Sequence, residues 1–202
     1  MDSKVMYNLS YGLFVLTARD GEKDNGCIIN TVCQVASEPN RISISVNKKN
    51  YTHDMILKTG VFNVSILDEK AKFGTFQHFG FRSGRDEDKT VGVELARSGN
   101  GLYYLADEEV NGYISAKVIQ SIDLGSHTLF IADVTDGAVL GDAPSATYAY
   151  YFANIKPKPE KRSKKGWVCI ICGYIYEGEV LPPDFICPIC KHPASDFRPV
   201  GD

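Results

Sequence analysis

Four of the six cysteines lie in the last 37 residues of the chain, as two Cys-x-x-Cys pairs that 14 residues separate. The pairs are Cys169 with Cys172 and Cys187 with Cys190. A unit shorter than ~40 residues rarely buries enough surface to fold unaided. Two such pairs can place four thiolates tetrahedrally around a metal ion, whose binding then contributes the folding free energy. The sequence therefore predicts a small C-terminal domain that folds around one metal.

The distribution of charge divides the chain into three parts. Residues 1–153 hold 14 basic and 19 acidic side chains, residues 154–165 hold 6 and 1, and residues 166–202 hold 2 and 5. The middle part alternates proline with lysine at its start, which favours an extended conformation. We therefore expect a large domain over 1–153, a basic linker over 154–165 and the metal domain over 166–202.

The remaining bulk properties narrow the class of protein. The longest apolar run near the start, Leu13–Leu16, is too short for a signal peptide, and no run approaches the ~20 apolar residues of a membrane helix. A net charge of -3 gives no support for nucleic-acid binding. We expect a cytoplasmic protein with no membrane or nucleic-acid partner. In a reducing cytosol its paired cysteines suit metal or redox chemistry better than disulfides.

The first part is expected to be mainly β, because short alternating or β-branched runs follow one another between turn signals. The expected strands are Tyr11–Ala18, Cys27–Val35, Arg41–Val46, Val61–Leu67, Gly112–Ile122, Thr128–Val134 and Thr147–Phe152. Consecutive strands with few helices between them favour an antiparallel sheet closed into a barrel. One helix should be capped by Thr52 and end at Gly60, and a second should cover Asp68–Phe79. The loop over 81–89 is too charged to be core.

Four sulfur ligands suit zinc and iron about equally, so the residues around them must decide. The turns Cys169-Ile-Ile-Cys172-Gly-Tyr and Cys187-Pro-Ile-Cys190 resemble rubredoxin. Its aromatic core would here come from Trp167, Tyr174, Tyr176, Phe185 and Phe197. The resemblance implies one iron that cycles between ferric and ferrous states, and a structural zinc ribbon is the alternative. The short spacing between the pairs and Lys191, where rubredoxins usually have glycine, depart from the pattern.

Two segments of the first part, 25–53 and 125–134, resemble the flavin reductase-like FMN-binding split barrel, which is also seen in flavoredoxin. The resemblance implies a split barrel with flanking helices, bound FMN and a homodimer formed through the barrel. The turn that carries Asn30, Thr31, Val32 and Gln34 would then face the flavin ring edge and ribityl chain. Cys27 and Cys33 are expected to be small buried residues.

The FMN phosphate is expected where Asn47, Lys48, Tyr51 and Thr52 run into the first helix, because a helix N-terminus favours anions. Lys48 and Thr52 are the preferred ligands. The loop with Ser83 and Arg85 could close on the phosphate or ring, and His127 matches a family position near the nicotinamide side of the flavin. Each has a purely structural alternative: a helix cap for Thr52, a solvated charge for Lys48, a plain surface loop for Ser83 and Arg85, and a strand histidine for His127.

The whole architecture resembles the high molecular weight rubredoxins, in which such a barrel is fused to rubredoxin. That resemblance implies electron transfer from an NAD(P)H:rubredoxin reductase toward a terminal acceptor, typically a flavodiiron protein that reduces oxygen or nitric oxide. The rival hypothesis is an enzyme that oxidises NAD(P)H directly, and a third is a zinc-stapled FMN-binding module. The absence of a GxGxxG fingerprint weakly favours the carrier. The sequence leaves open whether the tail docks on its own barrel or on a neighbour's.

Overall fold

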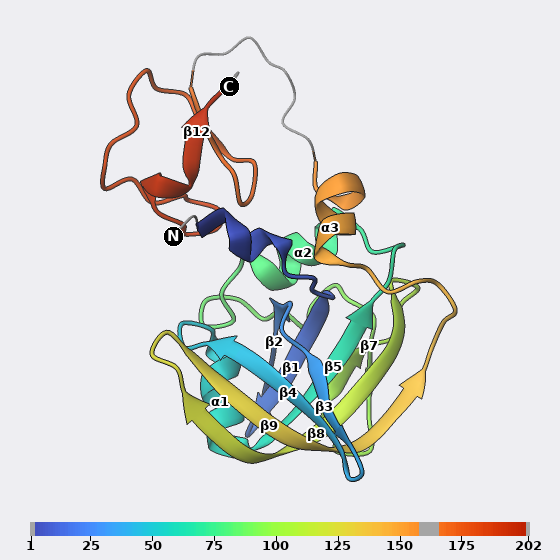
Figure 1. The fold of residues 1–202 in the computed structure, drawn as a ribbon. Coiled ribbons are helices and arrows are strands. Elements are labelled where there is room, and N and C mark those ends of the chain that lie inside the picture. Colours follow the sequence, from blue (N-terminus) through green and yellow to red (C-terminus); the bar gives the residue numbers. More distant parts are fainter. Residues whose placement is uncertain (1–2, 158–165, 201–202) are drawn as a thin grey trace.

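In the computed structural model, which describes residues 3–157 and 166–200, a β-barrel body is followed by a small three-stranded domain (Figure 1). One seven-stranded antiparallel sheet builds the body, in the order β2-β1-β5-β8-β9-β4-β3. Its strands are β1 (Phe14–Asp20), β2 (Lys23–Ile29), β3 (Cys33–Ser37), β4 (Asn40–Asn47), β5 (Val61–Leu67), β8 (Val110–Asp123) and β9 (His127–Val139). A separate hairpin pairs β6 (Leu95–Arg97) with β7 (Tyr103–Leu105). The predicted mainly-β class is confirmed.

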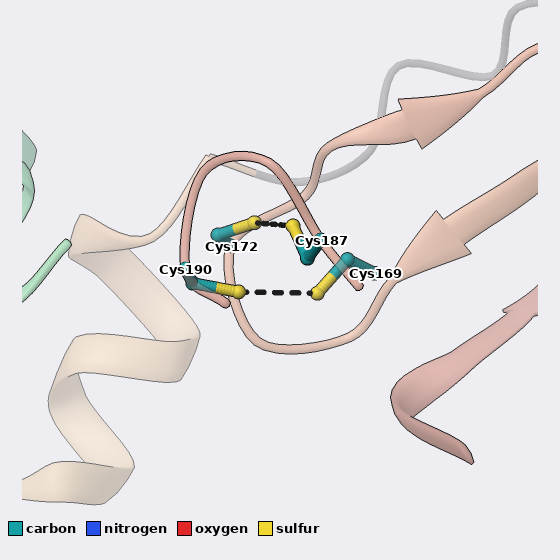
Figure 2. A group of neighbouring side chains, drawn as sticks. All are labelled: Cys169, Cys172, Cys187 and Cys190. Carbon is teal, nitrogen blue, oxygen red and sulfur yellow. Dashed lines mark hydrogen bonds between the residues drawn. The ribbon is translucent and has the colours of Figure 1, made fainter. Parts of the chain in front are cut away.

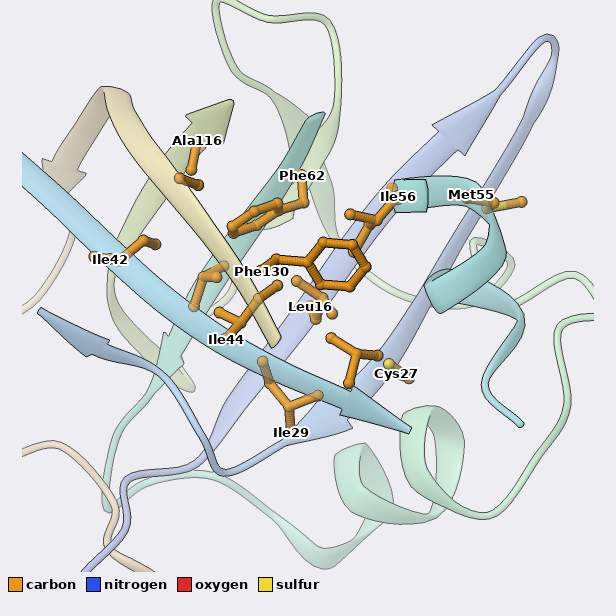
Figure 3. Close-up of a cluster of buried hydrophobic side chains, with 14 residues drawn as sticks. Leu16, Cys27, Ile29, Ile42, Ile44, Met55, Ile56, Phe62, Ala116 and Phe130 are labelled. Atoms are coloured by element: carbon orange, nitrogen blue, oxygen red, sulfur yellow. The ribbon is translucent and has the colours of Figure 1, made fainter. Parts of the chain in front are cut away.

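Alternating side chains explain why these segments become strands of a half-buried sheet. Along β4, Ile42, Ile44 and Val46 are buried while the residues between them are partly exposed. These residues join a core of fourteen buried side chains inside the barrel, in which Phe62 and Phe130 lie at the centre (Figure 3). The barrel interior is therefore filled by apolar side chains of this chain.

A second apolar cluster packs α2 (Phe73–Gly80), α3 (Tyr148–Tyr150) and η2 (Tyr151–Ile155) against the sheet. Phe76 and Phe79 of α2 pack with Val15 of β1 and with Tyr151, which begins η2. Helix α3 leads directly into η2. The remaining helices of the body are η1 (Ser3–Asn8) and α1 (Tyr51–Thr59). None of the helices in the described residues is long and apolar enough to cross a membrane.

The strand predicted over Thr147–Phe152 is wrong, because the chain is helical from Tyr148 onward. The Thr147 side chain accepts a hydrogen bond from the Tyr150 amide at 3.0 Å and so caps α3. The apolar side chains of this segment then pack as a helical face on the second cluster. Alternation of aromatic and small residues in the sequence indicated a strand. The helix cap and the packing on the second cluster instead stabilise a helix.

The two predicted helices are present, but their starts differ from the prediction. Asn50, not Thr52, is the N-cap of α1, while Gly60 ends the helix in a left-handed conformation with φ 71° as expected. The second helix starts at Phe73, five residues after the predicted Asp68. Asp68 is buried next to the end of β5, and its carboxylate accepts a hydrogen bond from the Lys70 amide at 2.7 Å.

The tail is a three-stranded sheet in which β10 (Trp167–Cys169) lies between β11 (Ile175–Tyr176) and β12 (Phe197–Pro199). A short helix, η3 (Ala194–Asp196), precedes β12. Helix η2 continues through Ile155, so the predicted extended linker begins with two helical residues. Most of that linker, residues 158–165, lies outside the described residues.

Candidate metal centre and cofactor cavity

The four tail cysteines form one cluster. Their sulfur atoms all lie within 4.8 Å of one another. The distance is 3.5 Å between the sulfurs of Cys169 and Cys190 and 3.4 Å between those of Cys172 and Cys187 (Figure 2). A tetrahedral ion with metal–sulfur bonds of ~2.3 Å needs sulfurs about 3.8 Å apart, close to this arrangement. The cluster therefore fits a four-sulfur metal site.

Two similar turns hold the ligands. The Gly173 amide donates to the Cys169 carbonyl at 2.8 Å, and the Lys191 amide donates to the Cys187 carbonyl at 2.9 Å. Gly173 has φ 80° and Lys191 has φ 60°. Both turns thus need a left-handed residue after the second cysteine, which glycine adopts without strain. Lys191, which stands where rubredoxins usually have glycine, therefore adopts a left-handed conformation that suits glycine.

Burial opposes ionisation of these thiols. It raises the pKa of Cys172 to about 12 and also raises the pKa of Cys190. Burial works against ionisation of Cys187 too, yet the Ile189 and Cys190 amides hydrogen-bond its sulfur and hold its pKa below the usual value. Four thiolates so close together repel one another, so a bound cation is what allows all four to lose their protons.

Aromatic rings surround the cluster as predicted. The Phe185 ring lies 4.8 Å from the Tyr176 ring and 5.4 Å from the Phe197 ring, measured between centroids. Trp167 and Tyr174 pack on the same small cluster. The tail core thus consists of buried sulfur and a few rings.

A cavity of about 570 Å³ lies between the barrel and the tail. Four of the residues predicted to bind FMN line it: Asn47, Tyr51, Thr52 and Ser83. Its other barrel residues include Asn25, Cys27, Lys49, Asn50, Gly84 and Lys89, and its tail wall runs from Pro188 to Pro193. The N-terminus of α1 and the loop after α2 therefore line one cavity, and its occupation by the FMN phosphate stays a prediction.

Polar groups with unused hydrogen-bonding capacity line the base of this cavity. Thr52 is fully buried, and its hydroxyl accepts a hydrogen bond from the Asn25 side-chain amide at 2.8 Å. The Asn25 Oδ1 atom is buried without a hydrogen-bond partner among the described residues. A Cβ on Gly84 would lie only 1.9 Å from that atom, so glycine alone lets the loop approach so closely. Thr52 thus contributes a buried hydroxyl here rather than a helix cap.

Lys89 supplies a buried positive charge to the same cavity. Its side chain is 4% exposed, and its ammonium donates to the carbonyls of Gly26 at 3.0 Å and Phe79 at 2.9 Å. No carboxylate lies within ion-pair distance of it in the described parts of the chain. Burial lowers the pKa of Lys89. A buried cation without an anion suits a site for a phosphate group, so the residues present fit FMN.

Sequence reasoning missed Lys89 because its loop carries many charges and was expected to be entirely outside the core. The side chain instead reaches under the loop to satisfy two carbonyls, and no local pattern indicates this. The cysteine prediction was half right: Cys27 is buried, but Cys33 is exposed. Cys33 lies on β3, an edge strand of the sheet with little covering it.

Several predicted site residues lie outside this cavity. The Lys48 ammonium pairs with the Asp123 carboxylate at 2.6 Å, and the Arg85 guanidinium pairs with Asp54 at 2.5 Å while lying over the Tyr51 ring. His127 Nδ1 lies 2.9 Å from the Ser126 hydroxyl.

The ring-edge turn also lies elsewhere. Val32 and Gln34 line a different cavity, of about 740 Å³, beside β8 and β9. The Thr31 hydroxyl donates to the Ser45 carbonyl at 2.7 Å, and Asn30 lines neither of these two cavities. The structure therefore separates the ring-edge residues from the phosphate residues, whose roles stay predictions.

Two family models match the chain. The flavin reductase like domain matches residues 6–158, and the rubrerythrin, rubredoxin-like domain matches residues 167–198. High molecular weight rubredoxin of Moorella thermoacetica is 37% identical over 99% of this chain and 100% of that protein. Ferric-chelate reductase (NAD(P)H) of Archaeoglobus fulgidus is 37% identical over 78% of this chain and 93% of that protein.

A solved structure shows the same fold. The NADH:FAD oxidoreductase of Streptomyces globisporus superposes with a TM-score of 0.65, at 19% identity, over 71% of this chain and 84% of that chain. Together with the four-sulfur cluster, these matches confirm the predicted flavin and single iron.

Proposed function

The chain belongs to the flavin reductase-like family, in the form that carries a rubredoxin-like domain, and we propose that it relays electrons from an NAD(P)H-linked reductase to a terminal acceptor protein. The observation that carries the proposal is the presence of a four-sulfur cluster and a flavin-type cavity within one chain. Bound FMN exchanges two electrons with a nicotinamide and releases them singly, whereas four-cysteine iron carries one.

The residues around the cavity are proposed to bind different parts of FMN. Thr52 offers its hydroxyl and Ser83 its loop to the phosphate, while Lys89 balances the negative charge from below. Tyr51 and Asn47 line the side of the cavity at the start of α1. Cys169, Cys172, Cys187 and Cys190 hold the iron. The proposed domain boundaries remain 1–153, 154–165 and 166–202.

The source of the electrons is tested by mixing the purified protein with NADH in the absence of oxygen. A carrier should keep its flavin oxidised for minutes with NADH alone and lose the flavin absorbance once a catalytic amount of NAD(P)H:rubredoxin reductase is added. Iron reduction should follow the flavin. Fast stoichiometric loss of the flavin absorbance with NADH alone would contradict the carrier hypothesis.

The second candidate function is direct oxidation of NAD(P)H by the barrel. It is favoured by the similarity to a ferric-chelate reductase whose name specifies NAD(P)H as donor. His127 is the residue proposed for the nicotinamide side of the flavin. If NADH alone bleaches the flavin, replacement of His127 by asparagine should slow that step several-fold and leave flavin binding unchanged.

The acceptor is proposed to be a flavodiiron protein. Oxygen uptake should appear when NADH, the reductase, this protein and a flavodiiron protein are combined, and it should stop when this protein is left out. Electron flow that bypasses this protein would contradict the assignment. The setting proposed for this pathway is the cytoplasm.

A homodimer through the barrel is also proposed. Val139 and Leu140, at the end of β9, are 87% and 42% exposed beside the cavity of Val32 and Gln34. Burial against a second copy would cover them. Light scattering should give twice the chain mass, and Val139→Glu should shift the protein toward the monomer.

A further inference from the structure

We propose that the second cysteine turn of the tail docks on the flavin cavity of its own chain, with Lys191 as the charged anchor. The inference rests on the proposed function only for its electron-transfer consequence, since docking itself is a contact between described residues. It assigns a role to a lysine that the metal site does not need.

Two cavities place this turn against the barrel. Pro188, Cys190 and Lys191 line the flavin cavity opposite Thr52 and Ser83. Pro188 and Ile189 also line a smaller cavity of about 450 Å³, whose other wall is made by α2 and the loop after it. The tail accordingly lies at the α2 end of the barrel (Figure 1). A metal ligand, Cys190, is therefore part of the wall of the flavin site.

Lys191 is the unexpected residue in this wall. Its φ of 60° is a left-handed conformation that strains a non-glycine residue and that glycine adopts freely. Strain of this kind persists where the residue has another role. The positive side chains that line the cavity are Lys49, Arg82, Lys89 and Lys191, against the carboxylates of Asp86 and Glu87. Lys191 thus brings a further positive charge from the tail to a site built for a phosphate dianion.

The first cysteine turn is held to the barrel body by another lysine. The Lys156 ammonium donates to the Ile170 carbonyl, between Cys169 and Cys172. Lys156 follows η2, so it ties the metal-binding loop to the helical end of the body. The second turn therefore faces the barrel, and the first is tied to the residue that follows η2. These contacts come from loops and a few side chains, which suits docking that can be reversed when an acceptor protein approaches.

The docked arrangement gives the electron a path that needs no second molecule. One electron would leave the reduced flavin and convert ferric iron to ferrous iron through the shared wall at Cys190. The reductant for the flavin is the NAD(P)H-linked donor of the proposed function, replaced in the tests by EDTA and light, which reduce the flavin itself. Release of the tail would then present the ferrous centre to the acceptor.

Hydrogen exchange of the full chain with both cofactors tests the docking itself. In Lys191→Gly, amides in the 80–87 loop should exchange several-fold faster than in the wild type, with iron content unchanged. Lys191→Arg keeps the charge and should behave as the wild type. Unchanged exchange of that loop in Lys191→Gly would overturn the proposed anchor.

Isotope-mixed cross-linking tests whether docking is within the chain. Lys49 and Lys191 line the same cavity and are both exposed, so a short amine-reactive linker should join them. In a refolded one-to-one mixture of ¹⁴N and ¹⁵N protein, the joined peptides should be all light or all heavy. Hybrid light–heavy peptides as a major product would show docking on another copy.

Electron transfer is the separate test. After a light flash has reduced the flavin at the expense of EDTA, the rate at which the iron is then reduced should not depend on protein concentration. Ile189→Glu should slow it at least tenfold, whereas Val180→Glu, at an exposed position outside both cavities, should not. A rate that rises with concentration, or that Ile189→Glu leaves intact, contradicts cis docking. If no electron reaches the iron although exchange and cross-linking show docking, the proposed function fails and the docking stands.

Discussion

The barrel and the tail show two ways in which parts of one chain reach a defined fold. The barrel buries fourteen apolar residues in its central cluster, with Phe62 and Phe130 entirely covered. In the tail cluster only Cys169, Cys187 and Phe197 are buried, and the remaining rings are partly exposed. The barrel is stabilised by apolar burial, whereas the tail needs its four thiolates bound to a metal.

Because of this difference, we expect the barrel and the tail to unfold separately. Loss of the metal should unfold the tail and leave the barrel, and loss of a core ring should loosen the barrel and leave the metal. The following substitutions test that independence.

The largest effect is expected from Cys187→Ser. Removal of a fully buried ligand should abolish iron binding and unfold the tail, with FMN and the barrel retained. Metal analysis, visible absorbance and flavin content measure these outcomes. Cys33→Ser, at an exposed cysteine far from the cluster in sequence, is the control and should keep the iron. Loss of flavin from a barrel that remains folded would show that the halves are not independent.

The reverse test is Phe130→Ala. Deleting a fully buried ring should cost the barrel ~3–5 kcal/mol and lower its melting temperature by about 10 °C. The fluorescence of released flavin measures the unfolding of the barrel. The visible absorbance of the iron centre measures the unfolding of the tail. The iron signal should persist above the new barrel transition. Simultaneous loss of both signals would make the chain one cooperative unit.

A smaller effect is expected at the phosphate. Lys89→Met should weaken FMN binding about tenfold or more, because a hydrogen-bonded charge contributes ~1.5–3 kcal/mol. The ratio of FMN affinity to riboflavin affinity is the measurement, since general loosening of the site would not change it. Lys48→Ala is measured beside it, because the sequence favours Lys48 and the structure pairs it with Asp123. A larger loss of that ratio at Lys48 would place the phosphate there.

The smallest effect is expected from Lys191→Gly on the stability of the tail. Relief of the left-handed strain should stabilise the tail by about 1 kcal/mol, with no change in the barrel transition. The rate of iron loss to a chelator should fall accordingly. A faster loss would mean that Lys191 stabilises the metal site rather than straining it.

The sequence predicted those features that depend on local pattern or on ligand chemistry. The four ligand cysteines, the bounds of β5 and the glycine end of α1 follow directly from spacing, alternation and turn chemistry. The strand predicted at Thr147–Phe152 failed because a helix cap and packing on α2 override alternation.

Contacts between side chains and groups that are distant in the sequence could not be predicted from the sequence. The buried Lys89 ammonium donates hydrogen bonds to two carbonyls, one of them 63 residues away, and Lys48 pairs with Asp123, 75 residues away. Both lysines look alike in the sequence, within charged or polar loops. Only the fold shows that Lys89 lines the cavity and that Lys48 lies outside it, paired with Asp123.

The cavity with walls from both ends of the chain also limits how freely the modules can be exchanged. A rubredoxin grafted from another protein would keep its four cysteines and its iron, but it would bring glycine to the position of Lys191. The graft would fold and carry electrons, yet the flavin pocket would lose part of its own lining. Barrel and tail are therefore expected to be inherited as a matched pair rather than as interchangeable parts.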